Sequence, residues 1–437
     1  MHSKSNMVIK INKLRTSFPV IMVCLTYILM FAVTKVFHIP VADSIGILPF
    51  HLMVVFLWMT FLLQILQRGT IKFGRIKTKG YLAFFIIWII YALISLSWAP
   101  VIRKGALQIT FLLIGCSLIF FSVYYFKRLE DFKILLKLWI SMLFIMLVLG
   151  FVNILSGYYL DSSRYYGSGG YYAPTAIFYN ENDFALYLGF GLTFLISSLR
   201  YTSKTKRIAG VVLLVMPALY LLIETGSAAV QLAFMITVVF WLMFMYGTVS
   251  RIKVVTFLVF SVLTVWLSLG NFFVDLINKT FYNFTELLYG IQNGVSSGGV
   301  RINLIKSSIY FFIASHGRGV GAGGVEYYMA NYSLYDTRDI ANVHNWWFEI
   351  LANYGIFIFI GYLIMYLFLF RNLFFYYRHT VNLQEKNICE ALLLGMVMFI
   401  LGSTSSSSVM GLYPQWMFFA FAIGFLNYLK NRKDCRP

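Results

Sequence analysis

The chain has 437 residues, of which 60% are hydrophobic and only 12% charged, and its formal net charge is +19. Its mean hydropathy is +0.78. Soluble domains carry about 25% charged residues, so this composition excludes a soluble enzyme and predicts an all-α protein that crosses a membrane many times.

Stretches long enough to cross the bilayer occur along the whole chain. A membrane helix needs about 20 apolar residues, because the hydrocarbon layer is about 30 Å thick and a helix rises about 1.5 Å per residue. The expected spans are 18–37, 45–66, 81–98, 106–126, 133–155, 176–198, 208–223, 228–246, 252–274, 346–370, 388–410 and 412–430. We therefore expect about twelve transmembrane helices in one integral membrane domain, residues 1–437.

The basic residues predict the orientation of these spans. With loops numbered alternately from a cytoplasmic N-terminus, 25 of the 35 Lys and Arg fall on the cytoplasmic side and nine outside. The positive-inside rule then predicts a multi-pass protein of the cell (plasma or inner) membrane with both termini in the cytoplasm. The positive charge lies in short loops beside spans, where anionic lipid attracts it. We expect the lipid bilayer, and no nucleic acid, among the partners.

The outer loop between the fifth and sixth spans, 156–175, combines tyrosines, glycines and one arginine, Arg164. Tyrosines interleaved with glycines suit stacking against sugar rings, and they suit an interfacial loop equally well. The polar group Asn180-Glu-Asn-Asp183 follows at the start of the next span.

One large outer loop, Asp275 to Asn345, separates the ninth and tenth expected spans. Within it, Ile302, Ile305, Ile309 and Phe312 recur at helical spacing and predict an amphipathic helix on the outer leaflet. Arg301 in its first turn could hold a phosphate bidentately, or it could contact lipid headgroups.

A glycine-rich segment follows, in which Gly319, Gly321 and Gly324 satisfy G-x-G-x-x-G. A dinucleotide site also needs a preceding strand and a βαβ unit, which the sequence lacks. We expect instead a turn that lets the backbone approach a substrate.

His344 and Asn345 stand directly before the tenth span. A histidine there could act as a general base or, when protonated, pair with a phosphate. Alternatively, Asn345 caps the helix and His344 is an interfacial residue.

Two further features bear on the site. The run Ser403 to Ser408 is expected to be a packing face of small residues, with a polar cavity wall as the alternative. No charged residue falls at the middle of a span, which argues against an ion-coupled transporter.

At this point the sequence resembles the O-antigen ligase and polymerase superfamily, over most of its length. His344-Asn345 with Gly355-Ile356 is similar to the family's His-Asn element and the Gly-Ile that follows it. Arg301 with Gly317–Gly324 resembles its loop arginine and glycine-rich element. Asn180-Glu-Asn-Asp-Phe-Ala185 resembles an Asn-x-Asn-x-x-Ala element.

One position departs from the family pattern. Members commonly carry a Ser-Arg pair after the seventh span, where this chain has Ser227-Ala228. If two arginines hold the donor phosphates in the family, another residue must supply the second one here. Arg164, Arg318 and Arg338 are the candidates.

The resemblance implies a metal-independent glycosyltransferase without a cofactor, whose donor is a glycan on undecaprenyl diphosphate. In this scheme Arg301 stabilises the departing diphosphate and His344 positions or deprotonates the acceptor hydroxyl. Asn180, Asn182 and Asn345 join the three candidate arginines as expected substrate-binding residues. No His, Asp and Glu cluster with metal-ligand spacing occurs in the outer loops.

The resemblance leaves the exact reaction open. A polymerase of lipid-linked repeat units is favoured, because residue usage rich in Lys, Ile, Asn and Tyr indicates an AT-rich genome and a cell without a lipid A core. The alternatives are a ligase that transfers a finished glycan, a flippase of lipid-linked sugars, and a non-catalytic membrane component of a polysaccharide machine, which the missing second arginine would favour. A flippase and a chain-length regulator of the same pathway are the expected protein partners.

Overall fold

The computed structural model describes residues 17–31, 39–42, 45–68, 75–246, 252, 256, 277–279, 281–282, 285 and 297–432. Within these ranges the regular secondary structure is helical apart from one short hairpin, in which β1 (Ile39–Ala42) pairs antiparallel with β2 (Ile45–Ile47). The expected all-α class is therefore confirmed.

The helices follow the apolar stretches of the sequence. They are α1 (Phe18–Leu29), α2 (Pro49–Arg68), α3 (Lys79–Ser95), α4 (Ile102–Tyr125), α5 (Leu129–Ser156), α6 (Glu181–Arg200), α7 (Lys204–Gly210), η3 (Val211–Val215), α8 (Met216–Glu224), α9 (Ala228–Met245), α12 (Ser297–Ala314), α13 (Gly324–Tyr332), α14 (Trp346–His379), α15 (Leu383–Gly402), η4 (Val409–Gly411) and α16 (Tyr413–Asn431). Each expected span except 252–274 overlaps one of them, and 252–274 lies almost wholly outside the described residues.

Seven segments in the described part are long and apolar enough to cross a membrane. They are Pro49–Gln67, Ile102–Tyr125, Leu129–Ser156, Glu181–Arg200, Lys204–Glu224, Ala228–Met245 and Trp346–His379. The chain is thus a multi-pass membrane protein, and the total of twelve spans stays a prediction. The most enclosed of the seven is α6, with 83% of its apolar window buried, because it packs along α15.

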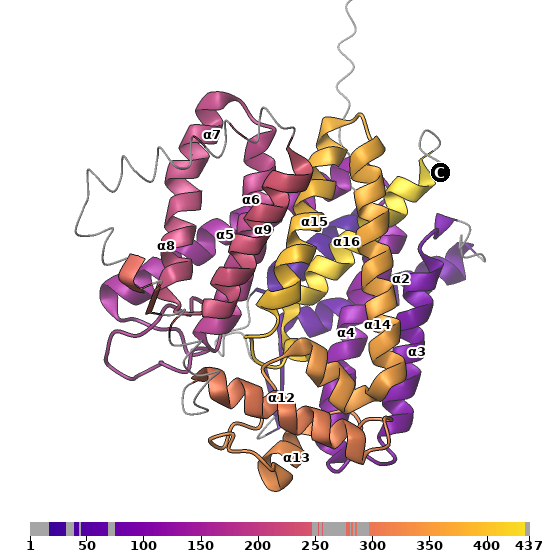
Figure 1. Cartoon of the computed structure of the whole chain (residues 1–437). Helices are drawn as coiled ribbons and strands as arrows, with labels where there is room; N and C mark the ends of the chain where they lie inside the picture. Colours follow the sequence, from indigo (N-terminus) through magenta and orange to yellow (C-terminus); the bar gives the residue numbers. More distant parts are fainter. Residues whose placement is uncertain are drawn as a thin grey trace, which may run out of the picture.

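The long helices run side by side, and α12 lies across one end of them with α13 beside it (Figure 1). The predicted helix is confirmed, and a second apolar stripe, which the sequence pattern did not single out, faces the protein; contact with the outer leaflet stays a prediction. Val300, Leu304 and Phe311 are buried in a cluster with residues of α13 and α14, whereas Ile309 is 37% exposed. The predicted stripe therefore lies on the more open side of α12.

Helix α14 is interrupted at Gly355, whose φ of 73° and ψ of −173° are not helical. The glycine-rich segment after α12 packs against this interruption: Ile356 N–H donates to the Gly317 carbonyl at 3.0 Å, and Val320 N–H donates to the Ala352 carbonyl at 2.8 Å. A Cβ on Gly319 would lie 2.5 Å from the Asn353 carbonyl oxygen.

These contacts correct the expectation that the glycines let the backbone approach a substrate. A Cβ on Gly321 would lie 2.9 Å from the Ser95 carbonyl oxygen of α3, and Ala322 N–H donates to the Ser95 hydroxyl at 3.0 Å. The glycines are needed because backbone packs closely on backbone here. The segment therefore fixes α12 and α13 to the C-terminal end of α3 and the N-terminal part of α14.

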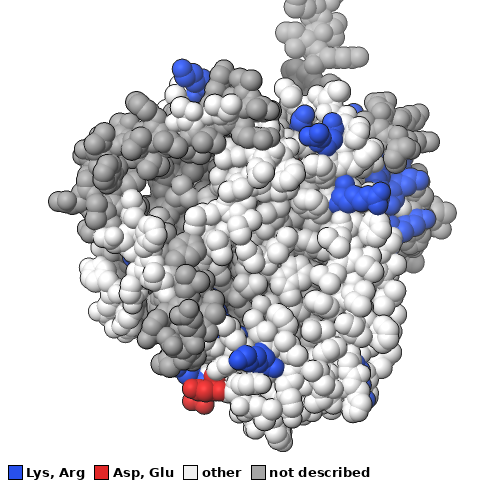
Figure 2. Space-filling view, in the orientation of Figure 1, with Lys and Arg blue, Asp and Glu red and all other residues white. Residues whose placement is uncertain are grey.

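Charged side chains are unevenly distributed along the bundle. On the face in Figure 2, lysines and arginines gather toward the end opposite α12 and α13, and a broad uncharged band separates them from the few charges at the other end. A band of this kind suits contact with hydrocarbon.

Candidate functional site

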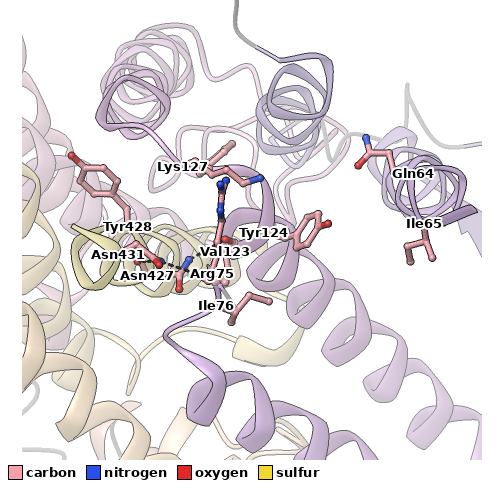
Figure 3. Close-up of a pocket in the computed structure, with 11 residues that line it drawn as sticks. Gln64, Ile65, Arg75, Ile76, Val123, Tyr124, Lys127, Asn427, Tyr428 and Asn431 are labelled. Atoms are coloured by element: carbon pink, nitrogen blue, oxygen red, sulfur yellow. Dashed lines mark hydrogen bonds between the residues drawn. The ribbon is translucent and has the colours of Figure 1, made fainter. Parts of the chain in front are cut away.

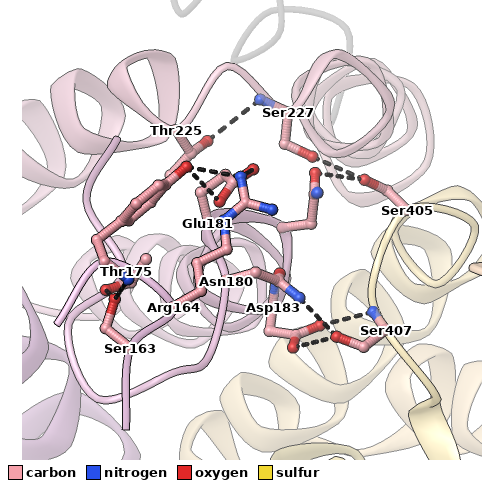
Figure 4. A network of polar contacts seen from close by, with 12 residues as sticks. Ser163, Arg164, Thr175, Asn180, Glu181, Asp183, Thr225, Ser227, Ser405 and Ser407 are labelled. Carbon is pink, nitrogen blue, oxygen red and sulfur yellow. Dashed lines mark hydrogen bonds and ion pairs between the residues drawn. The ribbon is translucent and has the colours of Figure 1, made fainter. Parts of the chain in front are cut away.

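A loop of serines forms the floor of the candidate site, at the end of the bundle that α12 covers. Helix α15 ends at Gly402, so residues 403–408 are not helical. Ser407 donates twice to Asp183, from its backbone N–H at 2.8 Å and its hydroxyl at 2.6 Å. Asn180 Nδ2 donates to the same hydroxyl at 2.6 Å (Figure 4). Hydrogen bonds to Asn180 and Asp183 therefore replace the expected packing face of small residues, and the alternative of a polar cavity wall stays a prediction.

The same loop reaches the start of α9. Ser405 Oγ donates to Asn182 Oδ1 at 2.9 Å and lies 2.9 Å from Ser227 Oγ. Ala228, the first residue of α9, is buried directly beside this contact. The position where the family pattern has an arginine therefore adjoins the network that holds Asn182.

His344 lies against the serine loop from the side of α14. Its backbone has a left-handed φ of 51°, and its backbone N–H donates to Asn342 Oδ1 at 2.9 Å. Its Nδ1 lies 3.2 Å from the Ser406 carbonyl oxygen. The Nδ1–H tautomer would donate to this carbonyl and leave the lone pair of Nε2 unprotonated.

The surroundings of His344 favour the neutral imidazole. Burial lowers its pKa to about 4, and the positive charges of Arg301 and Arg164 act in the same direction. His344 is therefore neutral at pH 7, and it can accept a proton but cannot serve as a resident cation for phosphate.

Asn345 has the structural role that the alternative interpretation gave it. Its Oδ1 accepts the Trp347 N–H at 3.1 Å and the Phe348 N–H at 3.4 Å, so it caps α14. The side chain is buried. This cap fixes the start of α14 and with it the backbone of His344.

Arg301 reaches the site from α12 and is the least compensated charge there. Burial lowers the pKa of its guanidinium, and the charge of Glu181 acts against this shift. Among the residues that the structure describes, no hydrogen-bond or ion-pair partner contacts this guanidinium. A desolvated charge without a close partner is unfavourable, so an anionic ligand would be strongly stabilised at this position.

Arg164 approaches the same carboxylate from the loop between α5 and α6. Its Nη2 donates to Glu181 Oε1 at 2.7 Å and to the Tyr165 hydroxyl at 2.6 Å. Glu181 thus carries the negative charge between Arg164 and Arg301, both of which act electrostatically on His344. Arg164, Glu181 and Arg301 form the charged cluster of the site, and the neutral His344 experiences the charge of both arginines.

The other two candidate arginines lie elsewhere. Arg318 stacks over the Trp98 ring, 5.2 Å from its centroid, and lines a separate cavity of about 260 Å³. Arg338 lies in the loop after α13, where its backbone N–H donates to Asp336 Oδ1 at 2.9 Å. Asn303 Nδ2 donates to the Asp336 carbonyl at 2.8 Å, which ties this loop to α12.

Comparison with known proteins places these residues in a family. A family model described as O-antigen ligase matches residues 211–363, which include Arg301 and His344. The teichuronic acid biosynthesis protein TuaE of Bacillus subtilis (strain 168) is 34% identical over 378 residues, which cover 83% of this chain and 75% of that protein. The chain belongs to the O-antigen ligase and polymerase superfamily.

Membership of this superfamily establishes a coarse function. The chain is a membrane protein of polysaccharide biosynthesis and a glycosyltransferase-like enzyme of the ligase or polymerase type. Within the described residues, no three His, Cys, Asp or Glu side chains gather as a metal site. That the reaction needs no metal stays a prediction.

The sequence did not predict the hydrogen bonds that connect the serine loop to the glycine-rich segment. Glu349, one turn into α14, accepts from the Ser408 hydroxyl at 2.6 Å and from Gln108 Nε2 at 3.4 Å. Gln108 Oε1 in turn accepts the Gly323 N–H at 2.9 Å. The serine loop and the glycine-rich segment are therefore connected through α4 and α14. The sequence signal was the unbroken run of six hydroxyl residues, 403–408.

Proposed function

We propose that the protein polymerises undecaprenyl-diphosphate-linked oligosaccharide repeat units into a cell-surface polysaccharide, on the outer side of the cell membrane. The observation that carries this proposal is the Arg301 guanidinium, which has no close partner in the described part of the chain and acts electrostatically on a neutral imidazole, His344. One group suits an anionic leaving group, and the other suits a hydroxyl that must lose a proton.

The proposed step transfers the glycan from one lipid carrier to a second lipid-linked repeat. The acceptor hydroxyl oxygen forms a bond to the anomeric carbon of the donor sugar, and the bond from that carbon to the diphosphate oxygen breaks. The diphosphate leaves with the electron pair, and Arg301 stabilises the charge that develops on it. His344 accepts the hydroxyl proton at Nε2.

Arg164 is the second phosphate-binding cation in this proposal. Its guanidinium is held by Glu181 and Tyr165, and the same Glu181 acts electrostatically on Arg301. The side chain is 42% exposed, so an incoming diphosphate can reach it. Arg318, in its separate cavity, is less suited to the task.

The asparagines at the start of α6 act in this scheme as positioning residues. Asn180 donates a hydrogen bond to Ser407, and Asn182 accepts one from Ser405. Both therefore hold the serine loop whose Ser406 carbonyl faces His344. Direct binding of the sugar by these side chains would require them to exchange these partners.

A ligase is the second candidate, because the family model that matches residues 211–363 is described as O-antigen ligase. A ligase would move a finished chain from the carrier to a final acceptor. The charged cluster suits either reaction, because donor and leaving group are the same in both.

Analysis of lipid-linked intermediates in a deletion strain distinguishes the candidates. We expect single repeat units on the outer leaflet and no long chains, and complementation with wild type but not with His344→Ala restores the chains. Long chains that persist on the carrier would replace the polymerase by a ligase. Single units trapped on the cytoplasmic leaflet would indicate a flippase.

A further inference from the structure

A polar cavity lies at the other end of the bundle, far along the helices from Arg301 and His344. It has a volume of about 600 Å³ and is lined by Gln64 of α2, Asn427 and Asn431 of α16, and the cations Arg75 and Lys127 (Figure 3). None of these residues takes part in the proposed transfer reaction.

Two amide side chains of α16 hold the walls of this cavity in place. Asn431 Nδ2 donates to the Arg75 carbonyl at 2.7 Å. Asn427 Oδ1 accepts the Lys77 N–H at 2.7 Å, and its Nδ2 donates to the Val123 carbonyl at 3.2 Å. The segment before α3 and the end of α4 are thus fixed around the cavity by specific hydrogen bonds.

Carboxylates around the cavity already have basic partners, including Glu130, which acts electrostatically on Tyr428 of the cavity wall and pairs with Lys133 at 2.9 Å. Asp131 accepts the backbone N–H of Lys127 at 3.1 Å and pairs with Arg128 at 3.1 Å. Glu385, which accepts from the Tyr428 hydroxyl of the cavity wall at 2.8 Å, pairs with Arg432. Arg75 forms no ion pair within the described part of the chain. The cavity therefore presents a net positive charge.

An apolar groove continues from this cavity along the bundle. It has a volume of about 540 Å³, lies between α2, α3 and α4, and shares Ile76 with the cavity. Lys79 stands at its polar end, and the groove runs along α3 as far as Ile89. Ten residues of helix span about 15 Å, which is half of a hydrocarbon layer about 30 Å thick.

We propose that the cavity and groove together bind one glycerophospholipid with an anionic headgroup. Its phosphate would lie between Arg75 and Lys127, with Lys79 at the glycerol, and one acyl chain would lie in the groove. Basic pockets between membrane helices favour anionic lipids by charge, and the adjoining groove distinguishes a lipid from a free phosphate. This site is independent of the proposed transferase function.

The test uses purified full-length protein reconstituted in vesicles of equal parts phosphatidylglycerol and phosphatidylethanolamine, then extracted and weighed by native mass spectrometry. We expect bound phosphatidylglycerol in excess on the wild type and at least a roughly tenfold lower excess on the Arg75→Gln, Lys127→Gln double variant. The Lys204→Gln, Lys206→Gln double variant makes the same charge change at α7 and should retain the wild-type excess.

A groove variant separates lipid from phosphate. Ala83 is exposed in the groove, so Ala83→Trp should fill it without disturbing the core and should reduce bound phosphatidylglycerol. Monodisperse elution in size-exclusion chromatography verifies the fold of each variant. Equal lipid retention by the wild type and the Arg75, Lys127 variant would overturn the proposal. Displacement of the lipid by millimolar inorganic phosphate, with Ala83→Trp unaffected, would make it a phosphate site instead.

Discussion

The Nδ1 atom of His344 lies 3.2 Å from the backbone carbonyl oxygen of Ser406. This contact joins the segment before α14 to the loop after α15. It determines which imidazole nitrogen remains available for chemistry. A carbonyl can only accept, so it selects the tautomer with hydrogen on Nδ1. The nitrogen left for chemistry is then an unprotonated Nε2.

The low pKa of His344 predicts an unusual pH profile. An ordinary histidine base, with a pKa near 6.5, loses activity below that pH. Because burial lowers the pKa of His344 to about 4, the neutral form persists well below pH 6. We expect kcat/KM of the reconstituted enzyme to stay constant from pH 8 to about 5.5 and to fall only as pH approaches 4. An acid limb near 6.5 would contradict this assignment, and His344→Ala should show no activity at any pH.

The activity should depend on both the charge and the shape of the side chain at position 301. Arg301→Ala should lower activity by roughly 100-fold or more, the usual effect of removing one group that stabilises a developing anion. Arg301→Lys should recover only part of it, since an ammonium cannot contact a phosphate bidentately. Glycan extension in membranes with matched protein levels measures both. Lys306→Ala, on the exposed side of the same helix, is the control and should retain activity. Full activity of Arg301→Ala would mean that the arginine only contacts lipid headgroups.

The sequence allowed the helices and several residues of the candidate site to be proposed, and the reason differs for each part. Hydropathy located α2, α4 and α5 because a membrane span must be apolar over its whole length. His344 and Arg301 were proposed because ionisable residues are rare in such a chain and these two lie in its one long polar loop. Their proximity could not be derived, since it depends on α12 crossing the end of the bundle.

The serine loop and the glycine-rich segment were misjudged for a common physical reason. Ser407 and Gly319 are small, and small residues allow either close packing or polar contact. Which of the two occurs depends on the partner, and Asp183 and Asn353 are more than 30 residues away in sequence. Local pattern carries no information about such partners.

Replacement of Ser407 should lower the stability of the protein, because its hydroxyl fixes the serine loop at the candidate site. Ser407→Ala would remove the hydroxyl that donates to Asp183 at 2.6 Å and leave a buried carboxylate oxygen without it. A lost buried hydrogen bond of this kind costs about 1–3 kcal/mol, so the thermal unfolding midpoint in detergent should fall. Ser97→Ala, which removes only an exposed bond to the Ile94 carbonyl, should leave the midpoint unchanged. Equal midpoints for both variants would refute a structural role for the Ser407 hydroxyl.

The orientation of the bundle can be tested with two exposed positions. Leu334, after α13, is 64% exposed, and Val381, between α14 and α15, is 92% exposed. In a background with the four native cysteines replaced by serine or alanine, Leu334→Cys should react with an impermeant maleimide on intact cells. Val381→Cys should react only after the cells are opened. The opposite pattern would place α12 and α13 in the cytoplasm.

The last prediction concerns Arg164, the residue proposed to take the role of the family arginine that is absent at Ala228. If Arg164 is the second diphosphate ligand, Arg164→Gln should raise KM for the lipid-linked donor and lower activity by about tenfold or more. Ala228 adjoins Ser227, whose hydroxyl lies 2.9 Å from Ser405, so we expect an arginine there to reach the same site. The Arg164→Gln, Ala228→Arg double variant should therefore recover part of the activity. Ala228→Met in the same background adds similar bulk without charge and should not. Wild-type KM in Arg164→Gln would exclude Arg164 from donor binding, and equal recovery by the methionine variant would show that charge at position 228 is irrelevant.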